Sequence, residues 1–263
     1  MDFTVDRKLV HAATGGGGFD PARPAVLFVH GAAMDHSVWA LQTRYFAHHG
    51  KTVLALDLPG HGRSEGPPLA SIEAIADWLD RLLDAAGLKH AALVGHSMGA
   101  LAALEMAARH PARVRALVLV GAAAAMPVNT ALLETARDDP ERARDMIVGW
   151  AFATGAQIGG AQAPGLWMTG GALRLLERAA VGVLANDFEA CNGYRQGHKA
   201  ATGLTCPVLV LSGEADRMTP AREGRALAKL IRSAVLVVTP GAGHMIMIER
   251  PDATLDALKE FLA

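Results

Sequence analysis

Residues 91–104 read AALVGHSMGALAAL, and they place one serine between an apolar run and a helical one. The first five residues are typical of a buried strand, and Met98–His110 is predicted to be a helix. Gly95, Ser97 and Gly99 form the pattern G-x-S-x-G at the junction. A serine on such a sharp turn needs small neighbours on either side, and the positive end of the following helix favours a developing oxyanion. We therefore predict that Ser97 is a nucleophile, not an ordinary helix-capping serine.

Around this junction, short apolar runs alternate with longer helical ones. Strands are predicted at Ala25–His30, Thr52–Leu58, Ala91–Gly95, Val114–Val120, Pro207–Ser212 and Ala234–Val238. Helices are predicted at Ser71–Ala86, Met98–His110, Pro220–Ile231 and Asp252–Leu262, with a further one capped by Ser37. Strands that are apolar on both faces and alternate with helices indicate an α/β fold, in which helices cover both sides of a parallel sheet.

The alternation stops between about Gly121 and Thr205, where the sequence is helix-like, rich in Gly and Ala, and without clear strands. We therefore expect a core formed by residues 1–121 and 206–263, with residues 122–205 inserted as a helical cap. The glycine run Gly15–Gly18 is interpreted as a loop, because no helix signature follows it and a phosphate-binding loop needs one.

A serine hydroxyl needs a base before it can attack a carbonyl carbon. Among the eleven histidines, His244 follows the last predicted strand, and Asp216 follows the strand before it. Loops at the carboxyl ends of parallel strands are where such sheets build their sites. The order Ser97, Asp216, His244 predicts a catalytic triad, with Asp216 orienting the imidazole. Glu214 is the rival acid; we favour Asp216 because the loop must extend past the strand end to reach His244.

The tetrahedral intermediate of acyl transfer needs two amide donors. One is expected from Met98, the residue after the nucleophile, and the other from the loop after the strand at residues 25–30. We assign the second donor to Ala32, and Ala33 stays open as an alternative. His30 and Gly31 are expected to support this loop.

Composition excludes several classes of protein. The formal net charge of −1 argues against a nucleic-acid partner. The charged N-terminus MDFTVDRKLV is unlike a signal peptide, and the most apolar window, Ala116–Met126, is too short to span a membrane. Cys191 and Cys206 lack metal-type spacing and are expected to be free thiols in a reducing cytoplasm. We expect a cytoplasmic protein with a small-molecule substrate and no metal; the oligomeric state is left open.

The chain resembles the α/β-hydrolase fold family, and most closely its capped, esterase-like serine hydrolases. The stretches that carry the resemblance are VHGAAMDHSVW (29–39), DLPGHGRS (57–64), GHSMG (95–99), LSGEADRMTP (211–220) and PGAGHMIMIERP (240–251). The resemblance implies an eight-stranded, mostly parallel sheet with a helical cap between strands six and seven, and no cofactor. It also implies that Asp57, His61 and Arg63 belong to a structural turn near the site.

Three cap residues, Trp150, Trp167 and Met168, are candidates for an apolar pocket over Ser97, although the simpler interpretation is that they fill the small core of the cap. Possible cationic groups for a substrate carboxylate are Arg174, Arg178, Arg195, His198 and Lys199. The main expectation is hydrolysis of a small, mostly apolar carboxylic ester through an acyl-enzyme. The alternatives are a C–C bond hydrolase of a diketone-type ring-fission product, a lactonase or perhydrolase with the same triad, and a non-catalytic binding protein.

Overall fold

The computed structural model describes all 263 residues, and its framework is one eight-stranded sheet. The strands are β1 (Asp2–Val5), β2 (Lys8–Ala13), β3 (Ala25–Val29), β4 (Thr52–Leu56), β5 (Ala91–His96), β6 (Val114–Val120), β7 (Val208–Gly213) and β8 (Val235–Thr239). Their spatial order is β1-β2-β4-β3-β5-β6-β7-β8. Strands β1 and β2 run antiparallel to their neighbours, and all the other pairs are parallel. The prediction of an eight-stranded, mostly parallel sheet is confirmed.

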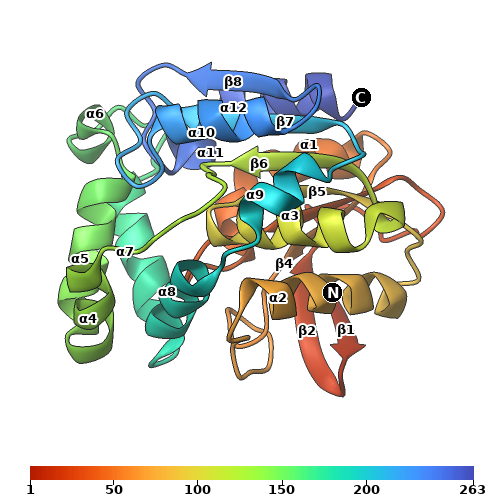
Figure 1. Ribbon diagram of the computed structural model, residues 1–263, viewed down its shortest axis with the longest axis horizontal. Helices are drawn as coiled ribbons and strands as arrows, with labels where there is room; N and C mark the ends of the chain where they lie inside the picture. The colour runs from red at the N-terminus through yellow and green to blue at the C-terminus, as the bar shows by residue number, and fades with distance from the viewer.

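Helices cover both faces of this sheet because its central strands are apolar on both sides. Along β3, Leu27 and Val29 pack into one apolar cluster, while Val26 and Phe28 pack into another. The first cluster is closed by α2 (Ile72–Ala85), α3 (Met98–Arg109) and α10 (Ala221–Leu230). The second is closed by α1 (Ala40–His48), α11 (Ile246–Glu249) and α12 (Pro251–Phe261). Figure 1 shows the sheet between these layers.

The predicted core elements agree with the observed ones to within one or two residues at most ends, but the first two strands were not assigned. They form a hairpin whose turn residues, Asp6 and Arg7, both have positive φ angles. Only alternate residues of β1 are buried, so the hairpin lacks the continuous apolar run that marks the central strands. Two short 3₁₀ helices, His36–Trp39 and Pro111–Arg113, complete the core connections.

Six helices separate β6 from β7. They are α4 (Thr130–Asp138), α5 (Pro140–Ala151), α6 (Thr154–Gln157), α7 (Met168–Arg178), α8 (Val183–Gly193) and α9 (Gly197–Thr202). Helices α4, α5, α7 and α8 stand together at one side of the sheet, whereas α9 lies across α3 (Figure 1). Ala200 and Ala201 of α9 belong to the core cluster, and the Tyr194 hydroxyl donates to Glu105 of α3 over 2.6 Å. The expected cap boundary at residue 205 therefore includes a stretch, from about residue 194, that packs as part of the core.

None of the helices combines the length and the apolar character needed to cross a bilayer.

Candidate active site

Ser97 lies in a strained turn between β5 and α3. Its φ and ψ angles are 53° and −118°, a region that residues with a side chain rarely occupy. The Ser97 amide donates to the carbonyl of Val120 over 3.0 Å, which ties the turn to the neighbouring strand β6. A Cβ atom at Gly95 would clash with the backbone of Gly99, and one at Gly99 would clash with the carbonyl of His30. The two glycines of the motif are thus required by close backbone contacts.

His244 and Asp216 form a buried pair at the ends of β8 and β7. The Nδ1–H of His244 donates to Oδ2 of Asp216 over 2.9 Å, and both side chains are almost fully buried. The other ring nitrogen, Nε2 of His244, has no hydrogen-bond partner. Ser97 and His244 line the same cavity. An imidazole held in this way keeps its Nε2 lone pair free for a proton from the cavity side.

Asp216 accepts four hydrogen bonds, which makes it a well-stabilised carboxylate. Its Oδ1 accepts from the amides of Met218 and Thr219 at 2.8 Å each, and its Oδ2 accepts from the Thr219 hydroxyl at 2.7 Å. Burial by itself raises the pKa of Asp216, but the charge and hydrogen bond of His244 and the Thr219 bonds hold this pKa below its usual value. Glu214 is exposed and accepts from the Gly241 amide instead, so the structure pairs His244 with Asp216 and not with its rival.

A buried carboxylate that sequence reasoning missed, Glu249, holds the loop of His244. Its two oxygens accept from the amides of Gly243 and Ala153 at 3.0 Å each. The His244 amide donates to the carbonyl of Ala151, at the end of α5, over 2.7 Å. Burial raises the pKa of Glu249, against the lowering effect of these amides. The position of His244 is therefore set in part by the segment between β6 and β7.

His96, beside the nucleophile, supports the same loop from below. Its Nε2–H donates to the carbonyl oxygen of His244 over 3.1 Å, and the ring is completely buried. Burial, reinforced by the charge that His244 can carry, lowers the pKa of His96 to about 3. His96 is thus a neutral structural residue. Its Nε2 holds the loop that carries His244, and its Nδ1 has no hydrogen-bond partner.

The loop after β3 supplies the candidate oxyanion donors. Ala32 lines the cavity, and its amide makes no hydrogen bond within the protein. The Ala33 amide, in contrast, donates to Oδ2 of Asp187 over 2.8 Å. The amide of Met98 lies in the first turn of α3, where no carbonyl of the helix is available to it. Of the two loop residues considered, only Ala32 therefore has an amide free for a substrate oxygen.

The cavity next to Ser97 has a volume of about 490 Å³, and 10 of its 19 lining residues are hydrophobic. Ser97, Ala32 and His244 contribute to the lining, together with Met126, Leu132, Trp150 and Phe188. Three charged residues of the β7–α10 segment also line it, namely Arg217, Arg222 and Glu223. The cavity is thus mainly apolar near the segment between β6 and β7, and charged on the side of α10.

Of the three aromatic and methionine candidates, the structure brings only Trp150 to this cavity. Trp167 is 75% exposed; it precedes α7 on a surface loop, and its ring lies against Gly170. Met168 is buried, but it packs in a separate apolar cavity of about 170 Å³ between α7 and the first turn after β3. None of the five cationic candidates in residues 122–205 lines the cavity of Ser97.

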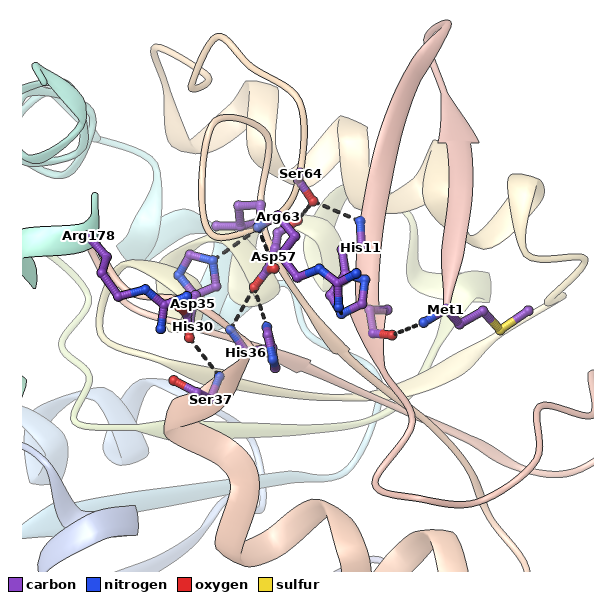
Figure 2. Close-up of polar contacts among 12 residues, drawn as sticks. Met1, His11, His30, Asp35, His36, Ser37, Asp57, Arg63, Ser64 and Arg178 are labelled. Carbon is purple, nitrogen blue, oxygen red and sulfur yellow. Dashed lines mark hydrogen bonds and ion pairs between the residues drawn. The ribbon is translucent and has the colours of Figure 1, made fainter. Parts of the chain in front are cut away.

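Asp57, His36 and His11 form the one group of side chains that could in principle hold a metal ion. Figure 2 shows how their bonds are already used. Asp57 accepts from the amides of His36 and Arg63 and from the His36 ring, at 2.8 to 2.9 Å. His11 donates from Nδ1 to Asp2, which leaves its Nε2 as an acceptor. This Nε2 faces the Arg63 guanidinium at 3.4 Å. A guanidinium at the open nitrogen of His11 is incompatible with a cation there, and the cluster fits the structural turn expected from the sequence.

Comparison with known proteins agrees with this architecture. Residues 24–251 match a family model described as the alpha/beta hydrolase fold. Among curated relatives, Protein ABHD8 of Mus musculus is 25% identical over 244 residues, which cover 90% of this chain and 54% of that protein. The chain thus spans about half the length of the first relatives it matches.

Solved structures cover the chain more fully. The enol-lactonase from Burkholderia xenovorans LB400 superposes with a TM-score of 0.89 at 26% identity, covering 100% of this chain and 99% of its own. A thermophilic esterase superposes with a TM-score of 0.82 at 29% identity, covering 100% and 96%. Both similarities extend over the sheet and over the helices between β6 and β7.

Proposed function

Because this chain belongs to the α/β-hydrolase fold family, we propose that it is a serine hydrolase with the triad Ser97, His244 and Asp216. One observation carries the proposal. The Nε2 atom of His244 is buried without a partner, in the lining of the cavity that also contains Ser97, while Asp216 holds the opposite ring nitrogen. Hydrogen bonds between nucleophile and base are often formed only in the substrate complex.

The proposed reaction begins when the Ser97 hydroxyl oxygen attacks the ester carbonyl carbon and His244 Nε2 takes the hydroxyl proton. The carbonyl π electrons move onto oxygen, and the amides of Ala32 and Met98 donate to this oxyanion. Collapse of the intermediate expels the alcohol, which receives the proton from His244, and leaves an ester on Ser97. Water then attacks this acyl-enzyme with the same base, and the acid product leaves.

The lining of the cavity supports a small, mostly apolar acyl group as the substrate. Trp150, Phe188 and Leu132 offer apolar surface to it. A C–C bond hydrolase of the diketone type is disfavoured, because the segment between β6 and β7 brings no cationic side chain to the cavity. We propose that residues 122 to about 193 form the cap that covers this substrate.

A lactone is the second candidate substrate. The likeness to the enol-lactonase favours it, as does Arg217, an exposed cation at the cavity for which no ion pair is formed. Such a charge suits a cyclic ester that also bears a carboxylate. The same triad would open the ring, with the alcohol and acid products remaining one molecule.

The test compares the wild type with Ser97→Ala, using Ser71→Ala as the control, because Ser71 caps α2 and does not line the cavity. Hydrolysis of p-nitrophenyl butyrate and labelling by a fluorophosphonate probe should both disappear in Ser97→Ala only. Retained turnover by Ser97→Ala would refute the nucleophile, and no labelling of the wild type would favour a binding protein. Replacement of Arg217 by Gln should raise KM for a carboxylate-bearing lactone and leave the neutral ester unaffected; equal effects on both would argue against the lactone.

A further inference from the structure

Asp187, a buried carboxylate of helix α8, binds the loop after β3 that contains Ala32 and Ala33, here called the oxyanion loop. Asp187 is 1% exposed, and its Oδ2 accepts from the Ala33 amide and from Nε2 of His61, at 2.8 Å each. These partners are 154 and 126 residues away along the chain. Asn186 donates to the other oxygen of Asp187 at 3.2 Å and to the carbonyl of Leu69 at 2.9 Å, so the carboxylate has a fixed orientation.

His61 supplies the counter-charge for this carboxylate. Its Nδ1 faces the carbonyl of Pro59 at 3.0 Å and its Nε2 faces Asp187, so both ring nitrogens meet groups that can only accept. Each nitrogen must therefore donate, which requires the imidazolium. Burial lowers the pKa of His61, but the hydrogen bond and charge of Asp187 outweigh it and raise this pKa above its usual value. The result is a buried ion pair beneath the loop.

The loop itself needs external support. Ala33 has a φ angle of 53°, in the left-handed region that a residue with a Cβ rarely adopts. Asp187 fixes the peptide between Ala32 and Ala33, because it binds the amide of that peptide. His30 fixes the preceding peptide, because its Nδ1–H donates to the Gly31 carbonyl over 2.8 Å while its Nε2 accepts from Leu58. The peptide groups before and after Ala32 are thus both held by hydrogen bonds, which fixes the direction of the free Ala32 amide.

We propose that Asp187 is a positioning residue for the oxyanion hole: by holding the Ala33 amide, it aims the Ala32 amide at the substrate oxygen. The inference rests on the proposed serine hydrolase function and adds a residue from outside the triad and the donors. It also links substrate binding to catalysis, because Phe188 and Cys191 of the same helix line the cavity. The helix that contacts the acyl group also fixes the donor that stabilises its transition state.

The experiment uses the full chain with Asp187→Ala and Asp187→Asn, and Glu189→Gln as the matched control. Glu189 is an exposed carboxylate on the same helix, paired only with Arg137 at the surface. Steady-state hydrolysis of p-nitrophenyl butyrate gives kcat and KM. The inhibition constant of an alkylboronic acid, which adds to a nucleophilic serine as a tetrahedral anion, reports on the oxyanion hole. Thermal unfolding shows whether each variant is folded at the assay temperature.

Loss of one oxyanion donor typically lowers kcat about 10²- to 10³-fold. We expect Asp187→Ala to approach this loss with KM changed less than about threefold, because the donor acts mainly in the transition state. Boronate affinity should fall by a similar factor. Asp187→Asn should retain part of both, since its amide oxygen can still accept from Ala33, and Glu189→Gln should match the wild type. If Asp187→Ala fails to fold, the same comparison is made with Asp187→Asn.

The inference is overturned if the folded Asp187 variants keep wild-type kcat and boronate affinity, or if kcat falls while boronate affinity does not. Either result leaves the triad intact, provided that Ser97→Ala in the same assay is inactive. Activity of Ser97→Ala would instead refute the proposed function, so the two failures are distinguishable.

Discussion

Replacement of Asp216 by Asn should reverse the tautomer of His244. The two amides bound at Oδ1 require an acceptor there, so the oxygen of the substituted carboxamide takes that place and its NH₂ group takes the place of Oδ2. The NH₂ group then faces Nδ1 of His244, which lies 2.9 Å from Oδ2 in the wild type. Two N–H groups cannot point at each other, so the His244 proton moves from Nδ1 to Nε2. An Nε2 that already carries hydrogen cannot accept the proton of Ser97.

The expected loss is about 10⁴-fold in kcat, the size seen when a triad histidine is held in the wrong tautomer. At 1.36 kcal/mol for each factor of ten, this corresponds to about 5.4 kcal/mol of transition-state stabilisation. The assay is p-nitrophenyl butyrate hydrolysis at pH 7, with thermal unfolding as the check on folding. Glu214→Gln is the matched control, since it removes a carboxylate two residues away that binds only the Gly241 amide.

A folded Asp216→Asn variant with more than about a tenth of wild-type kcat would refute this reasoning, because the tautomer argument predicts a loss in the thousands. So would an equal loss in Glu214→Gln, which would make the effect one of local charge.

Three further outcomes follow from the packing. Gly99→Ala should lower the free energy of unfolding by about 1–3 kcal/mol or more, because its Cβ would meet carbonyl oxygens at the end of β3. Gly149→Ala, with open space around it, should instead stabilise α5 by about 0.5–1 kcal/mol. Equal melting temperatures of the two variants would be inconsistent with this. Trp150→Ala should shift the preference of kcat/KM toward longer acyl chains and Trp167→Ala should not, so similar chain-length profiles would place the acyl site elsewhere. The pKa of His96 is about 3 in the folded chain and 6.5 in the unfolded chain, so only the unfolded chain binds a proton at this residue as the pH falls below 6.5. The urea midpoint should therefore decrease from pH 7 to pH 5. His96→Gln should reduce this decrease, and an unchanged dependence of the urea midpoint on pH would contradict the reasoning.

The sheet and the framework of the site could be predicted because their signals are local. Continuous apolar runs mark the central strands; Ser97 follows such a run directly, and Asp216 and His244 lie in the loops that follow two others. The choice of Asp216 over Glu214 followed from loop reach, and the structure pairs that residue with the histidine. The β1–β2 hairpin escaped notice because a half-exposed strand of four residues has no comparable run.

The supporting residues could not be predicted in the same way, because each acts across a large separation. Glu249 is surrounded in sequence by residues of an ordinary apolar turn, and its partner Ala153 lies 96 residues away. Asp187 is one polar residue among several in α8. Thr219 is the exception, since a threonine three residues after an aspartate is a common local partner for its carboxylate. Trp167 does not line the cavity, and its sequence context could not reveal this, because an aromatic residue in a glycine-rich segment gives no sign of whether its ring turns inward.

The segment between β6 and β7 contacts both halves of the proposed machinery. Its helix α5 ends at Ala151, whose carbonyl holds the His244 amide, and α8 supplies Asp187 to the oxyanion loop. If all of residues 122–205 moved away as one rigid body, the histidine loop and the Ala33 amide would both lose their partners. The hydrogen bonds lost at both places stabilise the closed arrangement, by about 0.5–1.5 kcal/mol for a neutral bond and about 1.5–3 kcal/mol for the bond to the Asp187 carboxylate. Substrate entry therefore favours movement of cavity-lining residues that make neither contact, such as Ala125, Met126 and Pro127 in the stretch before α4.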